Sequence, residues 1–381
     1  MKLQHLYDTI KNNSLSGRYI TLSDLFPILE KLSATCAMTV EGHSVLGANL
    51  YSVRWGSGPN KILAWSQMHG NESTTTKALF DLFAFLDSPG NLKAAVDSFL
   101  EKNTLLVLPM LNPDGAETYT RENANQIDLN RDAKKRSQPE SQVLRSVFER
   151  FKPDLCLNLH DQRTIYGLPG PKSATLSFLA PAANKKRSLT ASRKQSMQYI
   201  ATIAATLSEG LAGHIGRYDD TFNEYCVGDT FQRLGVPTIL FEAGHYPNDY
   251  QREETRKYVF FAFLALFQIS VTTNLDYRAY FDIPENNKMY RDVVLRNALV
   301  SNNERPISLA IQYKEELHQE TLRWVPYLDA LGPDLPLIGH KEIDIAGQQI
   351  LINSHENVFV NEEIVTLTYK NGGSIEDFLS F

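Results

Sequence analysis

The sequence of 381 residues is poor in cysteine, with only three such residues, all far apart. No two of Cys36, Cys156 and Cys226 form a C-x-x-C pair. The sequence therefore predicts neither a disulfide framework nor a metal site built from thiolates. A chain without disulfides is compatible with a reducing compartment.

Long apolar runs and an excess of basic charge are also missing. The longest apolar stretch, residues 258–271, is shorter than the roughly 20 residues of a membrane span, and Gln268 interrupts it. Residues 1–8 lack the apolar core of roughly 7 residues typical of a signal peptide, so we expect a cytoplasmic protein. The formal net charge is −6, and basic residues cluster only at 134–136 and 185–187, which disfavours nucleic acid as a partner. Neither a membrane protein nor a nucleic-acid binder is predicted.

A chain of this length usually forms more than one hydrophobic core, so we expect several domains. Residues 1–58 are interpreted as a leading segment packed on the catalytic domain. Between residues 59 and 271, short apolar strands alternate with helical patterns. This predicts an α/β domain with a mixed, largely parallel sheet and helices on both faces. From residue 272 to 381, repeated prolines and alternating apolar and polar residues predict a β-rich domain of unknown role.

Four short strands rich in Leu, Ile and Val organise the predicted α/β domain. They are expected at Lys61–Gln67, Thr104–Met110, Asp154–Leu159 and Pro237–Phe241, with helical patterns at 74–86, 140–151, 194–211 and 249–269. Their apolar composition is typical of strands covered on both faces. Because ligand sites of open α/β sheets form beyond the carboxyl ends of the strands, the residues after these strands are the candidates for function.

Three side chains that can bind a metal follow two of these strands. His69 and Glu72 come directly after the first strand, and His160 ends the third. Two imidazoles with one carboxylate are a common ligand set of catalytic Zn²⁺, which keeps a further position for water. The sequence therefore predicts one Zn²⁺ bound by these residues. Asp161, the next residue, could support a ligand or cap a helix.

Glu242 ends the fourth strand and lies in the segment Phe241–Gly244. An ionised carboxylate is costly to bury without a partner. A structural salt bridge would satisfy it. At the same rim as a metal, however, it can take a proton from the attacking water and pass it to a leaving amine. We therefore predict that Glu242 is the general base of an amide hydrolase.

Further polar residues follow the second strand. Arg121 could polarise a scissile carbonyl and stabilise its oxyanion. Arg131, together with Asn130, could bind a carboxylate through two parallel hydrogen bonds. Taken alone, each arginine is better interpreted as an ordinary surface residue. If they share the rim with the metal, the pattern predicts a substrate with a free carboxylate.

In combination, these motifs resemble those of the zinc carboxypeptidase superfamily. Along the chain they are H-G-N-E at 69–72, L-N-P-D-G at 111–115, T-R-E-N-A-N at 120–125, D-L-N-R-D at 128–132, L-N-L-H at 157–160 and F-E-A-G at 241–244. The resemblance covers residues 60–270. The short interval between Arg131 and His160 is similar to that of compact bacterial members acting on cell-wall peptides or small amides.

The resemblance implies a zinc-dependent carboxypeptidase that cleaves the C-terminal amide bond of a peptide. It implies the metal ligands and the base named above, and Arg121 as the residue that polarises the carbonyl. Asn130 and Arg131 would bind the terminal carboxylate of the substrate. Asp132 stands where many members have Asn. This departure leaves the carboxylate-binding pair intact and alters the charge beside it.

The family also often places a mobile tyrosine on the loop before the base. The resemblance implies Tyr218 for this role, with Tyr225 as a rival. The position that sets side-chain preference would fall near Val227–Asp229.

Other functions remain open from the sequence. Aspartoacylase-like and succinylglutamate desuccinylase-like deacylases share H-x-x-E, D-L-N-R and a third histidine, but the runs at 112–115 and 121–125 favour the peptidase branch. A non-catalytic relative that binds peptides or glycans is a further alternative, against which the complete ligand set and base argue. A serine hydrolase is disfavoured because residues 42–46 lack the second glycine of a nucleophile elbow.

Overall fold

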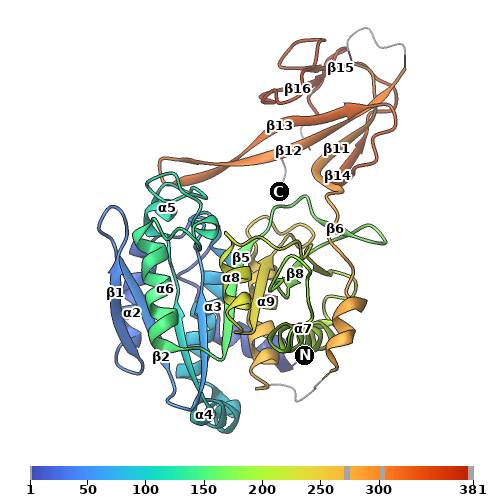
Figure 1. Cartoon of the computed structure of the whole chain (residues 1–381). Helices are drawn as coiled ribbons and strands as arrows, with labels where there is room; N and C mark the ends of the chain where they lie inside the picture. Colours follow the sequence, from blue (N-terminus) through green and yellow to red (C-terminus); the bar gives the residue numbers. More distant parts are fainter. Residues whose placement is uncertain (1, 270–274, 301–304, 376–381) are drawn as a thin grey trace. The chain divides into compact units, whose positions relative to one another are not determined.

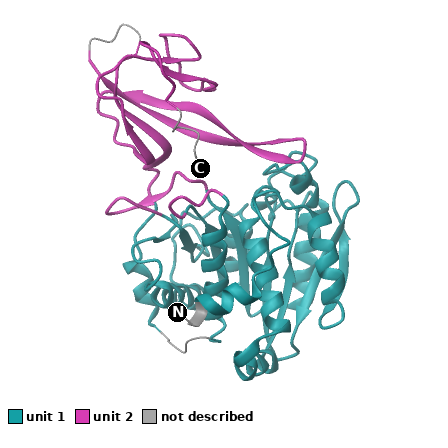
Figure 2. Cartoon of the chain, turned by 180° about the vertical axis from the view of Figure 1, so that it is seen from behind, with its two compact units in different colours: residues 1–162, 174–245, 251–286 teal, residues 163–173, 246–250, 287–381 magenta. Residues whose placement is uncertain are grey.

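The computed structural model describes residues 2–269, 275–300 and 305–375 (Figure 1). They form two compact units, of which the first comprises residues 1–162, 174–245 and 251–286, and the second comprises 163–173, 246–250 and 287–381 (Figure 2). The boundary predicted at 271/272 lies outside the described residues. Along this part of the chain, the first unit ends at Asn286 and the second resumes at Asn287.

The first unit is built on a mixed sheet with the strand order β1-β2-β4-β3-β5-β10-β8-β9. Its strands are β1 Ala37–His43, β2 Asn49–Trp55, β3 Asn60–Trp65, β4 Asn103–Leu108, β5 Leu155–Asp161, β8 Leu176–Leu179, β9 Ile215–Arg217 and β10 Thr238–Ala243. The strands β4, β3, β5 and β10 run parallel to one another. These are the four predicted strands, so the largely parallel sheet is confirmed. The leading segment supplies β1 and β2, which pair antiparallel at one edge.

Helices flank this sheet, as predicted. They are α1 Lys2–Ile10, α2 Leu22–Leu32, α3 Thr74–Asp87, α4 Lys93–Lys102, α5 Pro113–Glu117, α6 Pro139–Phe151, α7 Ala191–Leu207, α8 Val227–Arg233 and α9 Glu253–Leu266. Side chains of α6 and α8 pack with alternate residues of the strands, such as Leu63 and Trp65 of β3. The helix predicted at 249–269 begins only at Glu253, because Arg252 adopts a left-handed φ of +62°.

The core of the first unit lies between the sheet and these helices. Phe241 of β10 packs against Phe263 of α9, with ring centroids 5.7 Å apart. On the other face, Trp65 packs edge-on against Phe231 of α8 at 5.4 Å. Such burial of aromatic rings is the largest favourable contribution to a fold of this kind. Among the described residues, no helix has the length and apolar composition needed to cross a bilayer.

The second unit is rich in β-structure, as predicted. Its main sheet has the order β13-β12-β11-β14, formed by β11 Tyr290–Ala298, β12 Ile307–His318, β13 Thr321–Gly332 and β14 Ile338–Asp344. Two small sheets pair β15 Ile350–Ile352 with β16 Leu367–Tyr369, and β6 Gly167–Leu168 with β7 Lys172–Ser173. Its core includes Leu295, Leu309 and Leu328, all fully buried. The loops that follow β5 and β10 belong to this unit.

Candidate metal and catalytic site

The loop between β3 and α3 carries the first two candidate ligands. It packs so closely on α5 that a side chain at Gly70 would place its Cβ 1.9 Å from the backbone of Gly115. Gln67 closes the loop by donating from Nε2 to the carbonyl oxygen of Gly70 at 2.9 Å. The resulting turn directs His69 and Glu72 inward, and both side chains are buried.

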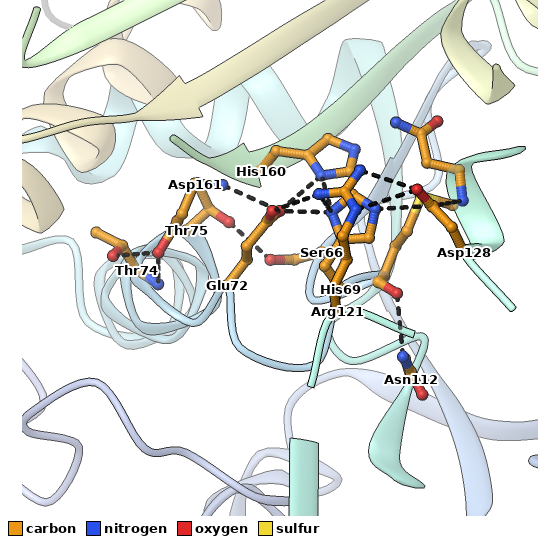
Figure 3. A network of polar contacts seen from close by, with 12 residues as sticks. Ser66, His69, Glu72, Thr74, Thr75, Asn112, Arg121, Asp128, His160 and Asp161 are labelled. Atoms are coloured by element: carbon orange, nitrogen blue, oxygen red, sulfur yellow. Dashed lines mark hydrogen bonds and ion pairs between the residues drawn. The ribbon is translucent and has the colours of Figure 1, made fainter. Parts of the chain in front are cut away.

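The donor atoms of His69, Glu72 and His160 converge, and all lie within 4.8 Å of one another. The Nδ1 atoms of His69 and His160 are 3.1 Å apart. Each also lies close to one carboxylate oxygen of Glu72, at 2.8 Å and 2.7 Å (Figure 3). In tetrahedral zinc sites with Zn–N bonds of about 2.0–2.1 Å, two nitrogen ligands lie about 3.3 Å apart. The donor set and its spacing therefore fit a zinc ion.

The pKa values of the three candidate ligands are shifted in different directions. Burial alone would raise the pKa of Glu72, but the charges of His69 and His160 outweigh it and hold the pKa well below its usual range. Burial lowers the pKa of His160 below its ordinary value. Burial alone would also lower the pKa of His69, but the charge of Glu72 and the hydrogen bonds with Asp128 and Glu72 outweigh it and raise this pKa. An ionised carboxylate and a neutral imidazole are the protonation states that metal ligands require.

Asp128 contacts Nε2 of His69, the ring nitrogen that would not bind the metal. Its Oδ1 lies 3.0 Å from His69 Nε2, and its Oδ2 accepts hydrogen bonds from Nε and NH2 of Arg121 at 3.1 and 3.0 Å. A carboxylate that accepts the Nε2 proton leaves Nδ1 of the ring available to a metal. Asp128 was not among the residues predicted from the sequence. Its position at the start of the D-L-N-R motif was the available signal.

Arg121 reaches the same group. Its NH1 lies 3.2 Å from His69 Nδ1 and 3.5 Å from Glu72 Oε1 (Figure 3). Asn112 holds the two loops together, because its Nδ2 donates to the carbonyl oxygens of Met68 at 3.3 Å and Glu122 at 3.1 Å. The structure thus brings Arg121 to the candidate ligands.

Glu242 lies at the same rim, on β10, directly opposite His160 in the parallel register of β10 and β5. Both strands extend one residue beyond these side chains. Burial, followed by the negative charges of Glu72 and Asp161, raises the pKa of Glu242 well above its ordinary value. Arg121 and Arg131 oppose this rise, so both arginines act electrostatically on Glu242.

Asn130 and Arg131 lie in a short 3-10 helix, Leu129–Arg131, directly after Asp128. Asn130 Oδ1 accepts a hydrogen bond from the amide of Val227 at 3.2 Å, which links this segment to the start of α8. The side chain of Arg131 is exposed, and its NH1 donates to the Asn130 carbonyl oxygen at 3.0 Å. Arg131 is therefore accessible to a ligand, whereas Asn130 is partly buried.

The tyrosine predicted to assist catalysis stays a prediction. Tyr218 follows β9, and its amide donates to the carbonyl oxygen of Phe178 at 3.0 Å. Its rival, Tyr225, is 40% exposed, with Lys134 Nζ 5.4 Å from the centre of its ring. In the segment 227–229, burial raises the pKa of Asp229 to about 7.

Comparisons with known proteins match part of this chain to carboxypeptidases. Residues 28–136 match the family described as zinc carboxypeptidase. Carboxypeptidase 2 of Trichophyton tonsurans is 34% identical over 104 residues, which are 27% of this chain and 19% of that protein. Carboxypeptidase SOL1 of Arabidopsis thaliana is 28% identical over 128 residues, which are 31% of this chain and 26% of that protein. The matched region thus spans only about a fifth to a quarter of these relatives.

Solved structures extend the likeness in fold beyond that region. A metallo-carboxypeptidase of Burkholderia cenocepacia superposes with a TM-score of 0.55 at 14% identity, covering 66% of this chain and 69% of that one. A metallo-carboxypeptidase of Pseudomonas aeruginosa, solved with (2-guanidinoethylmercapto)succinic acid, gives a TM-score of 0.50 at 17% identity, covering 65% of this chain and 68% of that one. The predicted resemblance to zinc carboxypeptidases and the predicted fold are confirmed. His160 and Glu242 lie outside the sequence match, so their assignment depends on the geometry above.

Proposed function

We propose that this relative of the zinc carboxypeptidases is a zinc-dependent enzyme that hydrolyses the C-terminal amide bond of a peptide. The observation that carries the proposal is the convergence of His69, Glu72 and His160 within 4.8 Å, beside Glu242 on the neighbouring strand. The match of residues 28–136 supports a metallocarboxypeptidase over a non-catalytic binding module.

Zinc would be held by Nδ1 of each histidine and by the carboxylate of Glu72. Two imidazole nitrogens and a carboxylate suit Zn²⁺ better than Mg²⁺ or Ca²⁺, which favour oxygen ligands. Bound there, Zn²⁺ would supply a Lewis acid and an activated water. Asp128 keeps the His69 ring in the orientation that presents Nδ1, since its Oδ1 lies 3.0 Å from Nε2.

Glu242 would accept a proton from the attacking water and later donate it to the leaving amine. Its carboxyl has a raised pKa, caused first by burial and then by Glu72, and a base with a raised pKa is the stronger proton acceptor once ionised. Arg121, whose NH1 lies 3.2 Å from His69 Nδ1, would donate to the oxygen that becomes negative as the carbonyl is attacked.

The substrate we propose carries a free terminal carboxylate. Arg131 is exposed and follows Asn130, and a guanidinium with an adjacent amide suits a carboxylate. The P. aeruginosa relative was solved with a succinic acid derivative, which also carries carboxylates, and this supports the same ligand chemistry here. Tyr218 would close over such a substrate.

The test is metal analysis of the purified protein together with a substrate screen. We expect one zinc per chain, loss of activity on chelation, and release of the C-terminal residue from peptides. The screen should include C-terminal peptides, muropeptides and N-acyl amino acids. Hydrolysis of N-acyl amino acids without hydrolysis of peptides would replace the proposal by a deacylase. Zinc binding without hydrolysis of any amide would replace it by a non-catalytic relative.

A further inference from the structure

Asp161 connects the segments that carry the candidate ligands. Because side chains alternate along a strand, Asp161 points away from its neighbour His160 and toward α3. Its Oδ2 accepts hydrogen bonds from Thr74 Oγ1 at 2.6 Å and from the Thr74 amide at 3.1 Å, at the first residue of α3 (Figure 3). Its own amide donates to Glu72 Oε2 at 3.2 Å. Asp161 therefore ties the end of β5 to the loop and helix that follow β3.

Arg252 connects the end of β5 to the end of β10. Its side chain is almost completely buried; NH1 donates to the carbonyl oxygen of Ala243 at 3.0 Å, and NH2 donates to that of Gln162 at 2.9 Å. Ala243 directly follows Glu242 in the sequence. One guanidinium thus bridges the strand of the proposed base and the strand of the third ligand. The left-handed φ of Arg252, +62°, is uncommon for a residue other than glycine, and such conformations persist where surrounding contacts over-determine them.

Arg18 approaches the same carboxylate from the leading segment, outside the region that matches the family. Its NH2 lies 3.8 Å from Asp161 Oδ2, and both side chains are buried. The carbonyl oxygen of Arg18 accepts a hydrogen bond from Ser73 Oγ at 2.5 Å, so this segment lies along the loop of the first two ligands. Burial raises the pKa of Asp161, and the positive charges of Arg18 and Arg252 oppose that rise. Asp161 is thus a buried carboxylate whose charged form both arginines favour, Arg18 from 3.8 Å.

We propose that Arg18, Asp161 and Arg252 form a positioning cluster that sets the separation between the metal-ligating group and Glu242. The inference rests on the proposed function. None of the three would touch zinc or substrate; they act through the backbone of β5 and β10 and through Glu72. A buried charge that loses its partner is costly, so removal of one member should shift the others. A guanidinium can reach two carbonyl oxygens at once, whereas a lysine ammonium acts as a point charge.

The test replaces Arg252 by Lys and by Met and measures two quantities. The first is the dissociation constant of Zn²⁺, obtained by competition with a chromogenic chelator and needing no substrate. The second is kcat and KM on the peptide that the wild type cleaves best. We expect Arg252→Met to weaken zinc binding or lower kcat by about 10-fold or more, the range seen for residues behind metal ligands. KM should change little, and Arg252→Lys should recover part of the loss.

A control lies in the first turn of α9, which begins directly after Arg252. Arg256 is fully buried and also donates to two carbonyl oxygens, those of Leu15 at 2.6 Å and Asn12 at 2.9 Å. It also forms a buried ion pair with Asp81, at 2.6 Å, so its loss should mainly destabilise the fold. Arg256→Lys and Arg256→Met should lower the Tm and leave the zinc dissociation constant unchanged. If Arg252→Met fails to fold, Thr74→Val provides a milder test, because it removes only the 2.6 Å hydrogen bond to Asp161 and keeps the side-chain volume.

Different results would overturn the positioning cluster and the proposed zinc-dependent function. A wild-type chain that binds no zinc would overturn both. A wild-type chain that binds zinc, with Arg252 and Thr74 variants that keep its zinc affinity and kcat, would overturn the inference alone. The positioning cluster is also overturned if the Arg256 variants lose as much zinc affinity and kcat as the Arg252 variants for the same fall in Tm. Weaker zinc binding or lower kcat at unchanged Tm would support the positioning cluster.

Discussion

Replacement of Asp128 by Asn and by Ala tests how the structure orients His69. In the wild type, Asp128 Oδ1 lies 3.0 Å from His69 Nε2, and Oδ2 accepts two hydrogen bonds from Arg121. Asn can still accept from the imidazole through its amide oxygen, but it loses the ionic pairing with Arg121. Ala loses both interactions. Comparison of the two variants therefore distinguishes the effect of orienting the His69 ring from the effect of placing Arg121.

The expected magnitude follows from these contacts. Partners behind metal-ligating histidines typically contribute 10- to 100-fold in metal affinity or activity, which corresponds to about 1.4–2.7 kcal/mol. Asp128→Asn keeps one interaction, so we expect a loss of about 10-fold, mainly in kcat through Arg121. Asp128→Ala should approach a loss of about 100-fold and should weaken zinc binding as well.

The assay combines chelator competition for Zn²⁺ with kcat and KM on a C-terminal peptide. Asp154→Asn is the control, because Asp154 lies before the start of β5 and its side chain accepts a hydrogen bond from a backbone amide, that of Lys61 at 2.8 Å. It should leave both quantities unchanged. Wild-type zinc affinity and kcat in Asp128→Ala would refute the assignment of His69 as a ligand oriented by Asp128.

Three further outcomes are expected. Glu242→Gln should bind zinc as the wild type does, measured by metal analysis, and should lose nearly all peptide hydrolysis. Persisting hydrolysis would exclude Glu242 as the general base. Gly70→Ala should abolish zinc binding or folding, because its Cβ would lie 1.9 Å from the backbone of Gly115. Chelator competition and thermal melting would measure this, and a variant with wild-type zinc affinity and Tm would contradict the close packing of this loop on α5. Burial raises the pKa of Asp292 from 3.8 to about 6, so this carboxyl holds its proton more tightly in the folded than in the unfolded state, and its contribution to stability should fall as pH rises from about 4 to about 6. In melting curves against pH, the wild type should therefore lose stability relative to Asp292→Asn over this range, whereas a constant difference between the two proteins would exclude this role of Asp292.

The parallel strands and the identity of the candidate ligands were readable from the sequence. Strands covered on both faces must be apolar, so KILAWSQ and DLCLNL stand out against their polar surroundings. Because parallel strands end at a common edge, the order of the strands and their last residues sufficed to place His69, His160 and Glu242 together. Their types then favoured a metal-assisted reaction with a carboxylate base over the non-catalytic alternative.

Other parts could not be predicted because they depend on contacts between distant segments. The pairing of Arg252 with the carbonyl oxygens of Ala243 and Gln162 leaves no local pattern, since backbone acceptors carry no sequence signature. The approach of Arg18 to Asp161 joins the leading segment to β5 across much of the chain. The sequence alone determined which side chains are available for the proposed reaction, because the spacing of apolar residues and the residue types are local properties. Only the tertiary structure decided which buried charges hold them in place, because burial and pairing arise when the chain folds.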